Sequence, residues 1–102
     1  MNFQKIVNLL TMCRRAGRLV GGFDVTLEAI VKHKSKCILV ASNTSEKTIK
    51  ELKYRVDSQN VQGVDFLSIP LTISDVDQYI GLNVGVIAIC DDGFAKAFKK
   101  LV

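Results

Sequence analysis

The stretch Cys37-Ile38-Leu39-Val40-Ala41 is a continuous apolar run of residue types that favour strands. A strand with one face in water alternates apolar and polar residues, and this run contains no polar position. It is therefore typical of a strand that is buried on both faces. Residues 84–90 form a second apolar run of the same kind. Two such strands predict a sheet in the middle of the fold, with helices on each side.

Helical patterns alternate with these strands along the chain. Apolar residues at three- and four-residue spacing predict helices over residues 2–16, 23–33 and 45–58, a short helix that stops at Gly81 and a last helix that ends near Leu101. Shorter stretches at residues 18–20 and 64–69 complete a count of four strands. The alternation predicts an α/β fold with one domain over residues 1–102. We expect a three-layer α/β/α sandwich with a central, mostly four-stranded mixed sheet.

Polar residues and glycines mark the helix ends. Asn43 with Glu46, and Thr72 with Asp75, have the spacing of a capping box. Gly17 stands where a C-cap glycine would end the first helix. In the second helix the periodicity turns either Val25 or Thr26 inward, and in the last helix either Ala97 or Phe98.

The chain is basic, and its positive charge is concentrated in the first third. It has 14 Lys and Arg against 10 Asp and Glu in 102 residues, a net charge of +4. Residues 1–36 contain seven basic and two acidic residues, whereas residues 37–102 contain seven basic and eight acidic residues. This asymmetry indicates a basic face that suits a polyanion.

The three cysteines are widely spaced and form no C-x-x-C pair, which excludes the usual zinc and thioredoxin-type motifs. Each of Cys13, Cys37 and Cys90 has apolar neighbours, so we expect buried, reduced thiols and a cytoplasmic protein. Polar residues interrupt the N-terminal region early, and no apolar run approaches the roughly 18 residues of a membrane span. We expect no membrane association.

Signals for an enzyme are weak. His33 is the single histidine and follows the second predicted helix, where it fits a C-cap. Asp91 and Asp92 follow a strand as paired carboxylates do in metal sites, and either one fits an N-cap of the last helix. No P-loop, Ser/His/Asp set or metal-ligand cluster is present in the sequence. We therefore expect no catalysis, no cofactor and no bound metal.

The turn Gly21-Gly22-Phe23-Asp24 is the strongest candidate for a binding site. Adjacent glycines let the backbone approach another molecule, and the N-terminus of a helix presents free N–H groups and partial positive charge. Basic residues flank the turn on both sides. They are Arg14, Arg15, Arg18, Lys32, Lys34 and Lys36. Together these features predict phosphate binding.

Three segments resemble one known family. Residues 12–22 (MCRRAGRLVGG) resemble the A-x-R-A-G-K-L-V-x-G opening of the ribosomal protein L-seven-Ae superfamily, and residues 36–43 (KCILVASN) resemble its A-K-L-V-L-L-A-x-D strand and loop. Residues 91–95 (DDGFA) resemble its D-x-G-F-A ending. The resemblance spans essentially the whole chain and is closest to the YlxQ-type branch of Gram-positive bacteria. It implies an α/β/α sandwich that binds kink-turn RNA, a sharply bent internal loop, with structured or ribosomal RNA and the ribosome as partners.

The kink-turn-binding archetypes of this superfamily contact RNA through a G-x-N-E-x-x-K motif at the start of the second helix. By the resemblance, this motif maps onto Gly22, Asp24, Val25 and Glu28. Only the glycine matches. Ionised Asp accepts hydrogen bonds but cannot donate them, Val makes none through its side chain, and Glu places a negative charge where the motif has Lys. Lys32 matches a basic position one turn later. An apolar family loop that covers an extruded base has its counterpart in Leu82-Asn83-Val84.

The resemblance and the residues together predict an RNA site. Its members are Arg14, Arg15, Arg18, Gly21, Gly22, Phe23, Asp24, Glu28, Lys32, Lys36, Asn43, Leu82, Asn83 and Val84. Phe23 either stacks on a base or serves as a buried staple residue. The alternative function is a protein-interaction module that keeps the fold and has lost kink-turn recognition. We expect a monomer.

Overall fold

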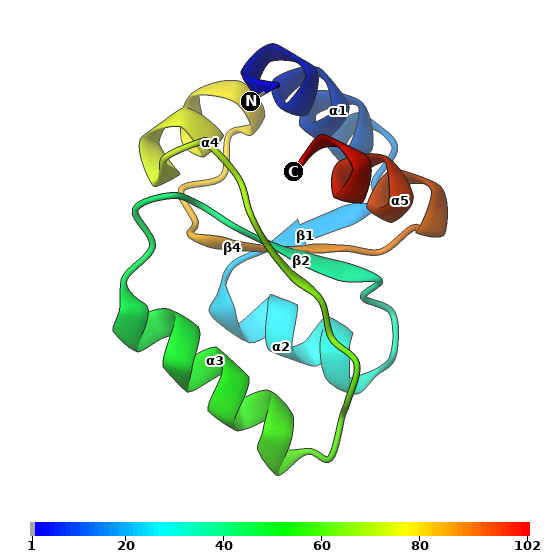
Figure 1. Ribbon diagram of the computed structural model, residues 1–102, viewed down its shortest axis with the longest axis vertical. Coiled ribbons are helices and arrows are strands. Elements are labelled where there is room, and N and C mark those ends of the chain that lie inside the picture. The colour runs from blue at the N-terminus through cyan, green and yellow to red at the C-terminus, as the bar shows by residue number, and fades with distance from the viewer. Residues whose placement is uncertain (1) are drawn as a thin grey trace.

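Helices and strands alternate along the chain in the computed structural model, which describes residues 2–102 (Figure 1). The elements are α1 (Phe3–Arg15), β1 (Leu19–Gly21), α2 (Phe23–Val31), β2 (Cys37–Val40), α3 (Glu46–Ser58), β3 (Phe66–Ser68), α4 (Ile73–Ile80), β4 (Val86–Ile89) and α5 (Asp92–Leu101). The predicted α/β class and the order of its elements are confirmed.

The sheet is mixed and has four strands in the order β1-β4-β2-β3. β4 runs antiparallel to both β1 and β2, and β2 runs parallel to β3. The two central strands are buried at every residue, as their uninterrupted apolar sequences predict. The outer strands are only three residues long, which leaves little unpaired backbone at the sheet edges.

Each central strand contributes side chains alternately to two separate cores. Cys37 and Leu39 of β2 pack with α1, α4 and α5, whereas Ile38 and Val40 pack with α2 and α3. Figure 1 shows the same division, with α1, α4 and α5 on one side of the sheet and α2 and α3 on the other. The expected three-layer sandwich is therefore confirmed.

Several predicted helix ends are confirmed. Gly17 follows α1 with a φ of 68°, its N–H donates to the Arg14 carbonyl, and the N–H of Arg18 donates to the Cys13 carbonyl. This is a Schellman motif, which needs a left-handed residue at the glycine position. Thr72 and Asp75 form the predicted capping box at the start of α4, with hydrogen bonds of 3.0 and 2.9 Å.

One predicted helix cap is wrong, and one of two alternative caps is confirmed. Ser45, and not Asn43, caps α3, because its hydroxyl accepts a hydrogen bond from the Thr48 N–H at 3.1 Å. Asn43 lies two residues farther from the helix, and its side-chain oxygen accepts from the Ile73 N–H at 2.8 Å. Asp91 caps α5 by accepting from the Phe94 N–H at 2.9 Å, which accounts for one of the paired carboxylates.

The strands are shorter than their apolar patterns suggest. β4 begins at Val86 and not at residue 84, and β3 covers only Phe66–Ser68 of the predicted stretch 64–69. β3 lies at an edge of the sheet and pairs only with β2, through three register pairs.

The structure also decides between the alternatives for two helices. In α2, Thr26 is the inward residue and Val25 is 44% exposed. In α5, Phe98 is the buried alternative.

The cysteine prediction holds for two of the three residues. Cys13 and Cys37 are buried, and burial raises the pKa of their thiols to about 12 and about 11. Cys90 is partly exposed, which contradicts the prediction that all three are buried. It follows the last residue of β4, where Val20 and Val25 line a small opening beside it. All three thiols are free.

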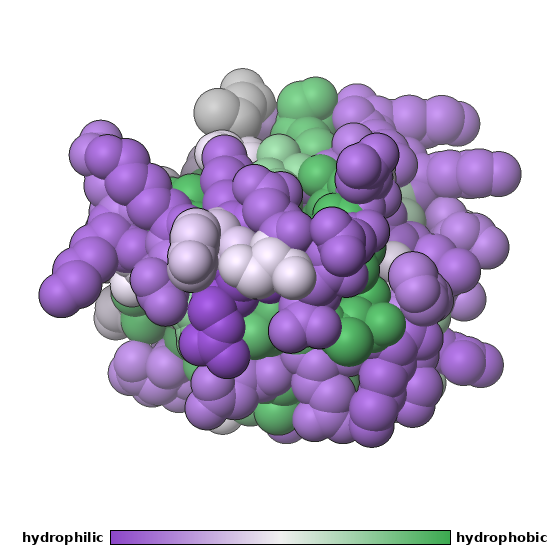
Figure 2. All heavy atoms as spheres, turned by 90° about the horizontal axis from the view of Figure 1, so that it is seen from below, coloured by the Kyte–Doolittle hydropathy of each residue, from purple (hydrophilic) through white to green (hydrophobic). Residues whose placement is uncertain are grey.

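The lower face of the molecule is largely polar. Seen from below, the molecule presents mostly hydrophilic side chains with smaller hydrophobic areas between them (Figure 2). Within residues 2–102, none of the helices combines the length and the apolar character needed to cross a membrane.

Phe98 is the largest fully buried side chain and joins α5 to the core beneath α1 and α4. We expect Phe98→Ala to lower the free energy of unfolding by about 3–5 kcal/mol, because a large cavity replaces its contacts. Urea denaturation followed by circular dichroism measures this loss. Tyr54→Ala is the control, since Tyr54 is 67% exposed and its loss should cost less than about 0.5 kcal/mol.

Candidate nucleic-acid interface

The two adjacent glycines form the passage from β1 into α2. Gly21 is the last residue of β1, and Gly22 is the N-cap of α2. The Gly22 N–H donates to the Val86 carbonyl at 2.9 Å, which ties the turn to the first residue of β4. Gly22 has φ 116° and ψ 158°, a conformation that only glycine adopts readily. The turn therefore depends on glycine for its shape.

An apolar loop lies against this turn. A Cβ built on Gly21 would meet Val84 Cγ2 at 2.9 Å and Leu82 Cδ1 at 3.1 Å. Leu82 and Val84 are partly buried against the first core, while Asn83 between them is exposed. The predicted apolar loop and the predicted glycine turn are thus in contact, although about 60 residues separate them in the sequence.

The start of α2 is open. Among residues 2–102, no side chain caps this helix, and no partner is found for the backbone N–H groups of Phe23, Asp24 and Val25. Such groups point outward along the helix axis and attract anions. Asp24 is exposed in this first turn, with its carboxylate near the positive end of the helix.

Phe23 and Val25 take different roles at this helix start. Phe23 is partly buried and packs on the core beneath α2 and α3, as the staple alternative predicts. Val25 is 44% exposed and its methyl Cγ2 comes within 3.7 Å of a Cβ built on Gly22, as Val84 Cγ1 does within 3.8 Å. Val25 therefore extends the apolar surface of the loop across the glycine.

The predicted basic residues fall into two groups. Arg14 lies near the apolar loop, because its Nε donates to the Ile80 carbonyl at 3.3 Å, just before Gly81. Arg18 and Lys36 lie at the opposite end of the sheet, where the Arg18 carbonyl accepts from Cys90 and the Lys36 N–H donates to Ile89. The length of β1, about 10 Å, separates Arg18 from Gly21.

Lys32 is not a free cation. Its Nζ lies 2.7 Å from Glu28 Oε1, one turn earlier on α2, and both side chains are more than half exposed. The hydrogen bond and the charge of Lys32 lower the pKa of the Glu28 carboxyl. The two charges largely cancel on this face of α2.

Asn43 belongs to a second loop that supports the site. Its neighbour Thr44 donates a hydrogen bond to the Gly85 carbonyl at 2.8 Å, and a Cβ on Gly85 would come within 2.6 Å of the Thr44 hydroxyl. Sequence reasoning missed Thr44 and Gly85. The signal was a glycine inside the apolar run of residues 84–90, which indicates close backbone approach.

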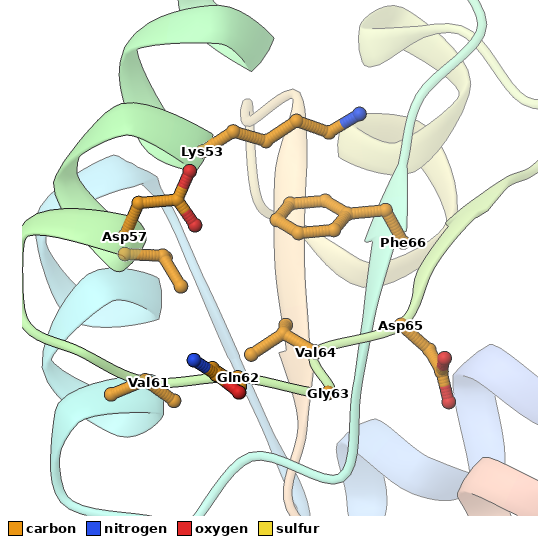
Figure 3. Close-up of a pocket in the computed structure, with 9 residues that line it drawn as sticks. Lys53, Asp57, Val61, Gln62, Gly63, Val64, Asp65 and Phe66 are labelled. Atoms are coloured by element: carbon orange, nitrogen blue, oxygen red, sulfur yellow. The ribbon is translucent and has the colours of Figure 1, made fainter.

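One hollow in the described part of the chain lies away from these residues. Its volume is about 560 Å³, and it opens between the second half of α3, residues 61–65 and Phe66 of β3 (Figure 3). Lys53 crosses above the Phe66 ring, with Nζ 5.2 Å from the ring centroid. None of the predicted site residues lines it. Within residues 2–102, no group of three or more His, Cys, Asp or Glu side chains is arranged to hold a metal ion.

Comparisons with known proteins agree on one family. Residues 4–97 match the model of the Ribosomal protein L7Ae/L30e/S12e/Gadd45 family. The chain is 35% identical over 101 residues to the RNA-binding protein YlxQ of Enterococcus faecium, covering 99% of this chain and 94% of that protein.

Two solved structures are similar in fold. A Bacillus halodurans protein of unknown function has a TM-score of 0.78 at 21% identity, with 93% of each chain covered. The Giardia lamblia 15.5kD RNA binding protein has a TM-score of 0.67 at 14% identity, with 97% of this chain and 88% of that chain covered. These neighbours share the architecture of the sandwich.

Gly22 offers a test of the turn itself. We expect Gly22→Ala to lower the free energy of unfolding by about 2–3 kcal/mol, because its φ and ψ lie in a region that Cβ disfavours strongly. Gly17→Ala is the matched control: its φ of 68° is left-handed and nothing lies within 4 Å of a built Cβ, so we expect a loss of about 1 kcal/mol. Equal losses in urea titrations would contradict the assignment of strain to Gly22.

Proposed function

The chain belongs to the ribosomal protein L7Ae/L30e/S12e/Gadd45 family, and from this premise we propose that it is a non-enzymatic protein that binds structured RNA. The start of α2 and the 81–85 loop form the contact surface in this proposal. Its relative in Enterococcus faecium is named an RNA-binding protein. More specifically, we propose that the protein is a cytoplasmic monomer that associates with the ribosome. Its free thiols support this location, because the cytoplasm keeps thiols reduced.

One observation carries the proposal: Gly21 packs directly against Leu82 and Val84 beside an uncapped helix start. Phosphates can approach the free N–H groups of α2, because no side chain caps this helix. An unstacked base can rest on the apolar surface of the adjacent loop, as RNA-binding proteins commonly arrange. Both contacts recognise the shape of a bent RNA more than its sequence.

The charge of the proposed site is supplied by α1 and not by α2. Arg14 and Arg15 are exposed in the last turn of α1, and Arg14 reaches the base of the apolar loop. Glu28 and Lys32 neutralise each other. We therefore assign phosphate neutralisation mainly to the arginines, with Arg18 and Lys36 contacting a more distant part of the RNA backbone.

A kink-turn is the RNA that we propose first. A kink-turn RNA and an unbent duplex of equal length, titrated at two salt concentrations, test this preference. We expect tighter binding to the kink-turn at both concentrations, because only the bent RNA offers an extruded base to the loop. Equal, salt-sensitive affinities would contradict kink-turn recognition. Absence of RNA binding would instead favour the protein-interaction alternative.

The triple variant Arg14→Ala, Arg15→Ala, Arg18→Ala tests the charge assignment. Each phosphate contact contributes about 0.7–0.9 to the slope of log K against log salt concentration, so we expect the slope to fall by about 2–3. The control removes the same charge from α3 through Lys50→Ala, Lys53→Ala and Arg55→Ala, and its slope should stay near that of the unmodified protein. An unchanged slope in the arginine variant would show that this patch does not contact RNA.

Glu28 provides a gain-of-binding test. Glu28→Lys restores the charge that the family motif has at this position and releases Lys32 from its ion pair. We expect RNA affinity to rise about fivefold to tenfold at low salt, since two positive charges then face the phosphates. Glu51→Lys on α3 makes the same change of net charge away from the site. A similar gain in both variants would indicate a non-specific effect of total charge.

A further inference from the structure

A groove of about 340 Å³ runs between α1 and α5, the first and last helices. These helices lie next to each other on the side of the sheet away from α2 and α3 (Figure 1). The groove is lined by Lys5, Asn8, Leu9, Met12, Ala97, Lys100 and Leu101. Apart from Asn8 and the two lysines, all of these side chains are apolar.

Met12 is the unusual residue of this groove. It is 56% exposed, although α1 has a well-defined buried face to receive apolar side chains. Leu9 and Leu101 beside it are partly buried and pack on the first core. The groove therefore has a hydrophobic floor with a flexible thioether at its edge, a combination that is typical of surfaces that accept partner helices.

The charges around the groove have one sign. Its two charged lining residues, Lys5 and Lys100, are both cations. α1 has no acidic residue, and α5 has none after Asp92. Among the described residues, Lys5, Lys96 and Lys100 have no acidic side chain within salt-bridge distance. The face is therefore complementary to a negatively charged partner.

We propose that this groove docks an acidic amphipathic helix of a partner protein. Apolar side chains of the partner at i, i+3 or i+4 would fill the space between Leu9, Met12 and Leu101, as in helix-in-groove recognition. Its carboxylates would pair with Lys5 and Lys100. The proposal does not rest on RNA binding, and the groove lies on the opposite side of the sheet from α2.

Other occupants fit this groove less well. RNA would bring phosphates onto an apolar floor, and no aromatic side chain lines the groove to stack on a base. A second copy of the chain would place Lys5 and Lys100 near the same cations of its partner, since a symmetric dimer pairs identical surfaces. An anionic lipid surface shares the charge preference, and the experiment distinguishes it.

The test uses two synthetic helical peptides of identical composition. One places leucines at i, i+4 and i+7 on one face and glutamates elsewhere, and the other has the same residues in scrambled order. Fluorescence anisotropy with labelled peptide and the full chain measures binding. We expect the patterned peptide to bind with a Kd on the order of 10–100 µM, the range of a small transient interface, and the scrambled peptide at least about tenfold more weakly.

Variants locate the binding surface. Met12→Glu should weaken binding of the patterned peptide at least about tenfold by placing a carboxylate against its leucines and glutamates. The double variant Lys5→Glu, Lys100→Glu should weaken peptide binding to a similar extent, and the remaining binding should no longer depend on salt concentration. Tyr54→Glu and the pair Lys50→Glu with Lys53→Glu are the matched controls on α3 and should bind normally. Circular dichroism and thermal unfolding verify that each variant is folded.

Three results would overturn the proposal. The first is equal binding of the two peptides. The second is full binding by the Met12 variant. The third is binding to vesicles of phosphatidylserine and phosphatidylcholine that depends on Met12, Lys5 and Lys100 while the patterned peptide does not bind, which would assign the face to a lipid surface. If the protein does not bind RNA in the tests above, the outcome of the peptide experiment is unaffected.

Discussion

The structure depends on the antiparallel pairing of β2 with β4 at the centre of the sheet. Four register pairs, from Cys37 with Ile89 to Val40 with Val86, join strands that are buried on both faces. Every side chain in this pair must be apolar, because each one enters one of the two cores. A slip of one residue would exchange the side chains of the two cores, so the register is strongly specified.

This register determines where the loops meet. β4 starts beside the end of β2 and, through its antiparallel pairing with β1, beside the end of β1. The glycine turn, the 41–45 loop and the 81–85 loop are therefore neighbours at one end of the sheet. Close contacts at Gly21 and Gly85 then hold these loops together. The candidate site is a consequence of the central pairing, with backbone groups and small residues as its main components.

The sequence predicts best those features that rest on local chemistry. Three features follow from a few adjacent residues and are present in the structure. They are the strand predicted at residues 37–41, which covers Cys37–Val40, the Thr72–Asp75 capping box and the left-handed Gly17. Features that depend on tertiary neighbours were harder to predict. Asn43 has the spacing of an N-cap, yet its oxygen bonds the start of α4, 30 residues away. Cys90 has apolar neighbours in sequence, but the gap between β1 and α2 exposes it.

The positions of the basic residues also depend on tertiary neighbours, and the structure places several of them differently from the prediction. Sequence proximity groups Arg18, Lys32 and Lys36 with the glycine turn, whereas the fold places Arg18 and Lys36 at the far end of β1 and neutralises Lys32 with Glu28. The turn itself is bordered by the apolar side chains of Val25 and Val84. We therefore expect an RNA partner to meet mainly apolar surface near Gly22 and positive charge from the end of α1. The helix α1 carries Arg14, which bonds the Ile80 carbonyl beside the apolar loop, and it also forms one wall of the groove beside α5.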